Sequence, residues 1–147
     1  MSEERTTINV LLCEAGKRAR VVEMEDSLEA MQKMVGGLIE EYMPFEDDVA
    51  LICNDEGKMR GLPLNRAIEG EDGKILDVIA GDFFICYAPV ESERFLPLPP
   101  DLEEKYKEKF YWPEQIFMKN GEGLKAIKYN PEFREQEVRM IKGERCI

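Results

Sequence analysis

The chain has 147 residues, of which 44% are hydrophobic and 35% are charged, and its formal net charge is −11. This length and apolar content suit one ordinary domain with a core, whereas the acidic balance disfavours binding to a phosphate backbone. The sequence contains no histidine, which excludes Ser-His-Asp and Cys-His nucleophiles and His-containing zinc sites.

Two features bear on the location of the protein. No apolar run approaches the roughly 20 residues that a membrane helix needs. The N-terminal segment Ser2–Arg5 is polar and lacks the apolar core of a signal peptide. We therefore expect a cytoplasmic protein without a membrane contact.

The acidic surface has two interpretations. Dense negative charge keeps a protein soluble and monodisperse, and the charge taken alone favours this interpretation. The same charge can also form a surface for a basic partner, for example by imitating nucleic acid.

Four cysteines are scattered along the chain: Cys13, Cys53, Cys86 and Cys146. They form no Cys-x-x-Cys pair, and three of them lie in apolar, strand-like stretches where a free thiol behaves as a small hydrophobic group. We expect reduced thiols and no disulfide framework.

The N-terminal region predicts a hairpin and a helix. Thr6–Cys13 and Arg18–Met24 are strand-like and flank a turn at Glu14–Lys17. A helix should start at Leu28, where Asp26 or Ser27 can cap it, and should end at Gly36-Gly37.

Three further strands are predicted at Leu38–Pro44, Val49–Cys53 and Asp77–Ala88. Val49–Cys53 contains no polar residue, so we expect a central strand that is covered on both faces. Asp77–Ala88 is predicted to be the longest strand. The intervening loop includes Pro63, which prevents a helix at that point, and Leu64–Ile68 could start a short helical turn.

The C-terminal part begins with Pro89–Pro100, whose four prolines are typical of a stiff connector. The elements expected after it are a helix at Leu102–Phe110 capped by Asp101, a hairpin of Gln115–Met118 with Leu124–Tyr129, and a charged helix at Glu132–Lys142.

These patterns predict an α+β fold with a mixed or mostly antiparallel sheet and one packed helix. We expect residues 1–90 to form this core domain. Residues 91–147 should form a helix and hairpin extension that packs on the core, so that the chain is a single compact unit.

The most distinctive local chemistry lies between the second and third of these strands. Lys58, Arg60 and Arg66 bring positive charge into an acidic chain, Asn65 can donate and accept hydrogen bonds, and Gly61 allows close approach of a backbone. Such a loop could hold a phosphate or carboxylate. In the structural alternative, Asn65 satisfies buried backbone groups and Arg66 pairs with a nearby acid. The pattern taken alone favours this alternative.

Asp82 is unusual because it interrupts the apolar stretch Asp77–Ala88. A carboxylate among apolar side chains needs partners, and the adjacent Gly81 indicates a bulge or a close backbone approach. We hypothesise that Asp82 lies near Asn65 or Arg66 and orients their loop, which adds Asp82 to the candidate ligand-binding residues.

Other motifs of ligand or metal binding are absent from the sequence. Asn54–Gly57 lacks the alternating ligands and distal glutamate of a calcium loop, and there is no P-loop or Gly-x-Gly-x-x-Gly segment. We therefore expect no metal, no cofactor and no catalytic residue.

Four ordered segments carry a resemblance to a known family: Met31–Glu40, Cys53–Lys58, Gly61–Arg66 and Ile79–Ile85. The last three contain Asn-Asp-Glu-Gly-Lys, Gly-Leu-Pro-Leu-Asn-Arg and Ile-Ala-Gly-Asp-Phe-Phe-Ile. Over about Asn9 to Ala88 the chain resembles a family known only as a domain of unknown function. Its members look like small acidic proteins from phages, prophages and conjugative elements of Gram-positive and gut bacteria. The resemblance implies a mobile-element setting and no established activity.

This resemblance and the charge together favour a non-enzymatic binding protein. We expect its partner to be a host protein, such as a defence component, that contacts the acidic surface. The alternative is a protein that binds a nucleotide or another small anion at Gly61–Arg66. A hydrolase ranks third because histidine is missing.

Overall fold

The computed structural model describes residues 6–132. Its largest sheet has five strands in the order β2-β1-β7-β4-β3. The strands are β1 (Thr7–Cys13), β2 (Arg20–Glu25), β3 (Ile39–Tyr42), β4 (Val49–Asn54) and β7 (Phe83–Tyr87). All four neighbouring pairs are antiparallel, in agreement with the predicted α+β class.

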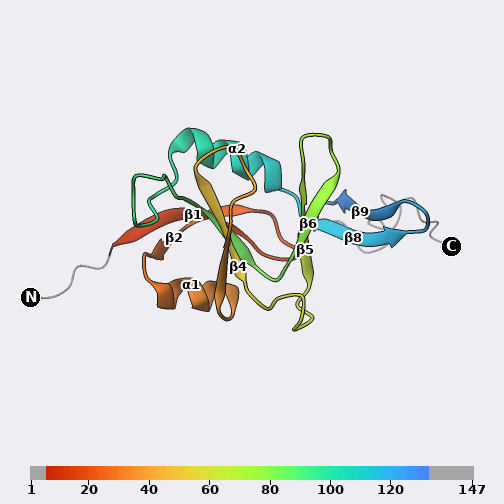
Figure 1. Cartoon of the computed structure of the whole chain (residues 1–147), viewed down its shortest axis with the longest axis horizontal. Coiled ribbons are helices and arrows are strands. Elements are labelled where there is room, and N and C mark those ends of the chain that lie inside the picture. Colours follow the sequence, from red (N-terminus) through yellow and green to blue (C-terminus); the bar gives the residue numbers. More distant parts are fainter. Residues whose placement is uncertain (1–5, 133–147) are drawn as a thin grey trace, which may run out of the picture.

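Two helices lie on opposite sides of this sheet, α1 (Leu28–Val35) and α2 (Pro100–Phe110) (Figure 1). Met31 and Val35 of α1 join one buried apolar cluster, and Tyr106 and Phe110 of α2 join the other. Strand β4 supplies both clusters because successive side chains of a strand point to opposite faces. Its six residues are all buried, so the prediction of a central strand covered on both faces is confirmed.

Local sequence explains where α1 begins and ends. The Ser27 hydroxyl accepts a hydrogen bond from the amide of Ala30 at 3.1 Å, as predicted for one of the two candidate caps. Gly36 ends the helix with φ of 81°, a left-handed conformation that glycine adopts without steric cost.

Helix α2 begins differently from the prediction. Pro99 is its N-cap residue and Pro100 occupies the first turn, so the predicted cap at Asp101 is wrong. Proline suits this position because its fixed φ matches the helix and its missing N–H has no partner there. Asp101 lies in the first turn, where its charge complements the helix dipole.

Two hairpins complete the described fold. One pairs β5 (Leu64–Glu69) with β6 (Ile75–Ala80), and the other pairs β8 (Glu114–Lys119) with β9 (Gly123–Lys128). The predicted C-terminal hairpin is thus confirmed. The helical turn expected at Leu64–Ile68 is wrong, because this segment is a strand.

The expected long strand at Asp77–Ala88 is also wrong. Gly81 has φ of 89° and separates β6 from β7, which belong to different sheets. A β-carbon at Gly81 would lie 2.8 Å from Cδ1 of Leu62, so the chain both turns and approaches another segment closely at this residue.

A proline-rich segment connects β7 to α2. In the proline-rich segment, the backbone of Leu96 exchanges two hydrogen bonds with Tyr87 of β7. No helix among residues 6–132 is long and apolar enough to cross a membrane. The helix predicted at Glu132–Lys142 lies outside the described residues, except for Glu132 itself.

Candidate functional site

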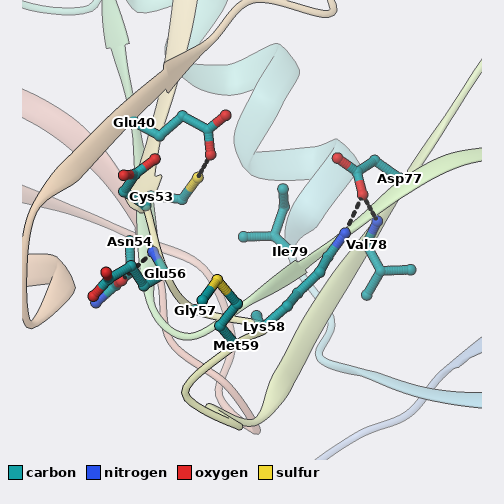
Figure 2. A pocket seen from close by; sticks show the side chains of 12 residues that line it. Glu40, Cys53, Asn54, Glu56, Gly57, Lys58, Met59, Asp77, Val78 and Ile79 are labelled. Atoms are coloured by element: carbon teal, nitrogen blue, oxygen red, sulfur yellow. Dashed lines mark hydrogen bonds and ion pairs between the residues drawn. The ribbon is translucent and has the colours of Figure 1, made fainter.

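A pocket of about 250 Å³ lies between the end of β4 and strand β6 (Figure 2). Glu40 of β3 and the turn that follows β4 form other parts of its wall. Val78 and Ile79 supply an apolar side (Figure 2). The pocket is therefore built from three segments that are distant in sequence.

Negative charge dominates this pocket. Four carboxylates and one lysine line it, which leaves a formal charge of −3: Glu40, Asp55, Glu56 and Asp77 with Lys58. Positively charged or hydrogen-bond-donating groups therefore suit this pocket better than anions do.

Lys58 is engaged inside the pocket. Its Nζ atom lies 2.6 Å from Oδ1 of Asp77 (Figure 2), and the same oxygen accepts a hydrogen bond from the amide of Val78 at 2.7 Å. An anion at Lys58 would have to compete with Asp77, because the two opposite charges already satisfy each other.

The thiol of Cys53 lies beside a carboxylate of the pocket wall. Its Sγ atom lies 4.0 Å from Oε1 of Glu40 (Figure 2). Burial, together with the neighbouring carboxylates of Glu40 and Asp77, raises the pKa of the thiol to about 11. A thiol with this pKa is protonated at neutral pH and is a poor nucleophile.

Asn54 and Gly57 hold the turn that closes the pocket. The Asn54 side chain donates to the carbonyl of Val35 at 3.1 Å and accepts from the amide of Glu56 at 2.8 Å. A β-carbon at Gly57 would lie 2.5 Å from the carbonyl oxygen of Ala80. Glycine is thus required for the close contact between this turn and β6.

The carboxylates do not gather into a metal-binding arrangement within residues 6–132, where no group of three or more Asp, Glu or Cys side chains could hold an ion.

Asn65 and Arg66 lie elsewhere, in the core. Both side chains are 0% exposed. The Asn65 amide donates to the carbonyls of Cys13 and Gly81, each at 2.9 Å. This pair of hydrogen bonds joins β5 to the end of β1 and to the junction of β6 and β7. The predicted structural role of Asn65 matches these contacts.

Among residues 6–132, the partners of the Arg66 guanidinium are carbonyl oxygens and not a carboxylate. Its Nε and Nη2 atoms donate to the carbonyl of Phe110 at 3.1 and 3.0 Å, and Nη2 also donates to Lys17 at 2.7 Å. Phe110 is the last residue of α2, where the helix dipole is negative. Burial lowers the pKa of Arg66, while a guanidinium stays charged in proteins.

Glu114 is the acidic group that interacts electrostatically with Arg66. Its Oε1 atom accepts a hydrogen bond from the amide of Ala67 at 2.9 Å and so joins β8 to β5. Burial raises the pKa of Glu114, whereas the charge of Arg66 lowers it. Arg66 and Glu114 thus partly neutralise each other at the join between α2, β5 and β8.

The other candidates are dispersed. The carboxylate of Asp82 accepts a hydrogen bond from the amide of Ala15 at 3.1 Å. Asp82 directly follows Gly81, whose carbonyl accepts a hydrogen bond from Asn65. That Asp82 itself orients the loop of Asn65 and Arg66 stays a prediction. Arg60 donates to the carbonyl of Gly36 at 3.2 Å, and Gly61 has φ of 72° in the turn after β4.

The six sequence candidates therefore do not form one site. Asn65 and Arg66 are brought together in the interior, and of the six only Lys58 lines the pocket. Glu40, Cys53 and Asp77 were missed as pocket residues. Their sequence signals are weak, because exposed acidic residues and a cysteine in a strand are ordinary features.

One family model matches residues 8–111, and its description is Domain of unknown function (DUF3846). The match spans every motif segment on which the sequence resemblance rests. No curated protein and no solved structure matches the chain.

Proposed function

Because this chain belongs to the DUF3846 family, a domain of unknown function, we propose from its surface that it is a non-enzymatic protein that binds a basic partner protein. The binding surface is the acidic edge of the five-stranded sheet, formed by β3 and the turns on either side of β4. The exposed carboxylates of this acidic edge are Glu40, Glu41, Glu46, Asp48, Asp55 and Glu56.

The observation that carries the proposal is that, in the described part of the chain, the carboxylates of this edge are not paired in salt bridges, although Lys58 and Arg60 lie in the turn after β4. Within residues 6–132, none of the six carboxylates forms a salt bridge. The neighbouring acid Asp47 differs, because it lies 2.6 Å from Lys105. Like charges that are left side by side repel one another, and a partner rich in Lys or Arg relieves this repulsion.

The state of the thiols supports binding over catalysis. Burial raises the pKa of Cys13 to about 12 and that of Cys53 to about 11, and it also raises the pKa of Cys86. All three are protonated at neutral pH, which makes them poor nucleophiles.

The resemblance to mobile-element proteins extends the proposal to a setting. We propose a cytoplasmic protein whose partner is a host protein, such as a component of a defence system. An acidic edge can occupy the surface where such a partner holds nucleic acid, because both present rows of negative charge.

Affinity capture with the full chain from a bacterial lysate tests the proposal, followed by calorimetry with the purified partner at several salt concentrations. The acidic-edge variant carries Glu40→Gln, Glu41→Gln, Asp55→Asn and Glu56→Gln. The control variant removes four exposed carboxylates elsewhere: Glu71→Gln, Glu91→Gln, Glu93→Gln and Glu104→Gln. Both variants have the same net charge.

We expect the acidic-edge variant to bind about tenfold more weakly or worse, since each exposed charge pair contributes roughly 0.2–1 kcal/mol. The control variant should stay within about threefold of wild type, because only long-range attraction is reduced. A partner whose affinity is insensitive to salt, or equal losses in the two variants, would contradict the proposal.

The alternative, binding of a nucleotide or another small anion at Gly61–Arg66, is left with Lys58, Arg60 and Gly61. Asn65 and Arg66 are enclosed, and Lys58 pairs with Asp77 among three other pocket carboxylates. Calorimetric titration with ATP, GTP and inorganic phosphate tests this alternative. A signal that is lost in Lys58→Ala would support it, and flat titrations would exclude it.

A further inference from the structure

Strand β3 ends the five-stranded sheet with an unpaired edge. Within residues 6–132 its partner is β4 alone, on one side. Exposed strand edges present backbone N–H and C=O groups that can pair with another chain.

The backbone groups that face away from β4 can be identified. The amide of Asp55 donates to the carbonyl of Leu38 at 2.8 Å, and Glu40 and Tyr42 follow Leu38 at the two-residue spacing of an antiparallel ladder. The alternate residues Ile39 and Glu41 therefore direct their N–H and C=O groups outward.

The side chains along this edge indicate which kind of strand would be complementary to it. Leu38–Met43 carries two negative charges and no positive charge. Glu40 and Glu41 are adjacent, so their side chains point to opposite faces of the sheet. Leu38 and Met43 flank them and are 60% and 47% exposed. A complementary strand would place two adjacent basic residues opposite the glutamates and apolar residues at its ends.

We propose that the partner docks by adding an extended segment with adjacent Lys or Arg residues as a sixth strand along β3. This inference rests on the proposed function and specifies its binding mode. Backbone hydrogen bonds supply affinity and the flanking side chains supply selectivity in this mode of recognition.

A second copy of the chain fits this edge poorly. Two β3 strands side by side would bring Glu40 and Glu41 of both copies together, and like charges at paired positions are destabilising. The other outer strand, β2, has a mixed-sign surface that includes Arg20 and Glu23, and it serves as the control.

The test uses the full chain labelled with ¹⁵N and the peptide Ile-Thr-Lys-Arg-Thr-Val as the probe, with Ile-Thr-Glu-Glu-Thr-Val as its control. Amide hydrogen exchange is followed residue by residue. We expect the basic peptide to slow exchange at Ile39 and Glu41 by tenfold or more at saturation. The outer amides of β2 should be unaffected, and the acidic peptide should have no effect.

Two substitutions at one residue separate charge from backbone pairing. Glu41→Gln removes only the charge, and we expect roughly threefold weaker peptide binding. Glu41→Pro also removes an outward N–H while leaving the ladder with β4 intact, and we expect a loss of tenfold or more. The matched control is Glu23→Pro on β2. The amide of Asp26 donates to the carbonyl of Thr6, so alternate residues from Asp26 face β1, and the N–H of Glu23 faces outward. This variant should bind like wild type.

The outcomes separate this inference from the proposed function. If the basic peptide binds through the acidic edge but protects no alternate amides, and Glu41→Pro matches Glu41→Gln, strand addition is overturned and the proposed function stands. Absence of binding at low salt also overturns strand addition, and the lysate capture then decides the proposed function. Concentration-dependent dimers that protect the same amides without peptide would assign the edge to a second copy. The exchange pattern of the wild-type protein gives an answer even if Glu41→Pro fails to fold.

Discussion

The guanidinium of Arg66 donates a hydrogen bond of 2.6 Å to the side-chain oxygen of Asn65, its neighbour in sequence, and both side chains are fully buried. Adjacent residues of a regular strand point to opposite faces. Here the register of β5 shifts between Leu64 and Arg66, which lets the two side chains meet. The hydrogen bonds of this pair join β5 to β1, to the β6–β7 junction and to the end of α2.

Loss of Arg66 should destabilise the fold. Arg66→Met removes the donors to Phe110 and Lys17 and leaves their carbonyls without these partners. We expect the free energy of unfolding to fall by about 2–4 kcal/mol. Urea denaturation at pH 7 measures it. Arg60→Met is the control, since Arg60 makes an exposed hydrogen bond to Gly36 and should cost less than about 1 kcal/mol. Equal losses in the two variants would contradict the prediction, because the buried contacts would then add no more stability than the exposed hydrogen bond of Arg60.

A methyl group at Gly57 should disturb the pocket. In Gly57→Ala the new β-carbon would meet the carbonyl oxygen of Ala80 at 2.5 Å, so we expect a loss of about 1–3 kcal/mol and shifted amide resonances along β6. Gly70→Ala, whose nearest atoms lie at 3.4 Å, should stay within about 1 kcal/mol of wild type. Thermal unfolding measures the loss of stability, and ¹⁵N spectra measure the shifted resonances. A Gly57→Ala variant as stable as wild type would contradict the prediction, because the turn would then accommodate the methyl group without loss of stability.

Cys13 should make stability depend on alkaline pH. Burial raises the pKa of its thiol from 9.0 to about 12. Above pH 9 the unfolded chain loses this proton while the folded protein retains it, so stability falls as pH rises from 9 towards 12. One such group contributes a slope of about 1 kcal/mol per pH unit. Cys13→Ala should flatten the curve by that amount. Val10→Ala, a buried change without a titratable group, should lower stability at every pH and keep the slope.

Alkylation should report the electrostatics of the pocket. The pKa of Cys53 is raised from 9.0 to about 11, so at pH 8 its thiolate fraction is about 100-fold lower than in the unfolded chain. Peptide mass spectrometry after iodoacetamide treatment should show correspondingly slow labelling. Glu40→Gln should accelerate it, because the carboxylate of Glu40 raises that pKa. Labelling in the folded protein as fast as in urea would contradict this description of the pocket.

Several elements were readable from local sequence because their causes are local. Val49–Cys53 is apolar throughout, and it forms a strand buried on both faces. Ser27 and Gly36 mark the ends of α1 by capping chemistry that needs only neighbouring residues. The turn residues at Asn120-Gly121 separate the two strands of the C-terminal hairpin.

Other features depend on contacts between distant segments. The apolar run Asp77–Ala88 reads as one strand, yet close packing of Leu62 on Gly81 divides it. Pairing with β6 makes Leu64–Glu69 a strand, because tertiary contacts override local propensity.

The sequence by itself determined an acidic α+β protein, the positions of most of its strands and helices, and the exclusion of histidine chemistry. Only the tertiary structure decided that Arg66 is enclosed while Glu40 and Glu41 lie on an open edge. Burial of a charged side chain depends on which carbonyls the fold brings within its reach, and exposure of a strand edge depends on which strand the fold places last. Neither property is encoded in the identity of the residue or of its immediate neighbours.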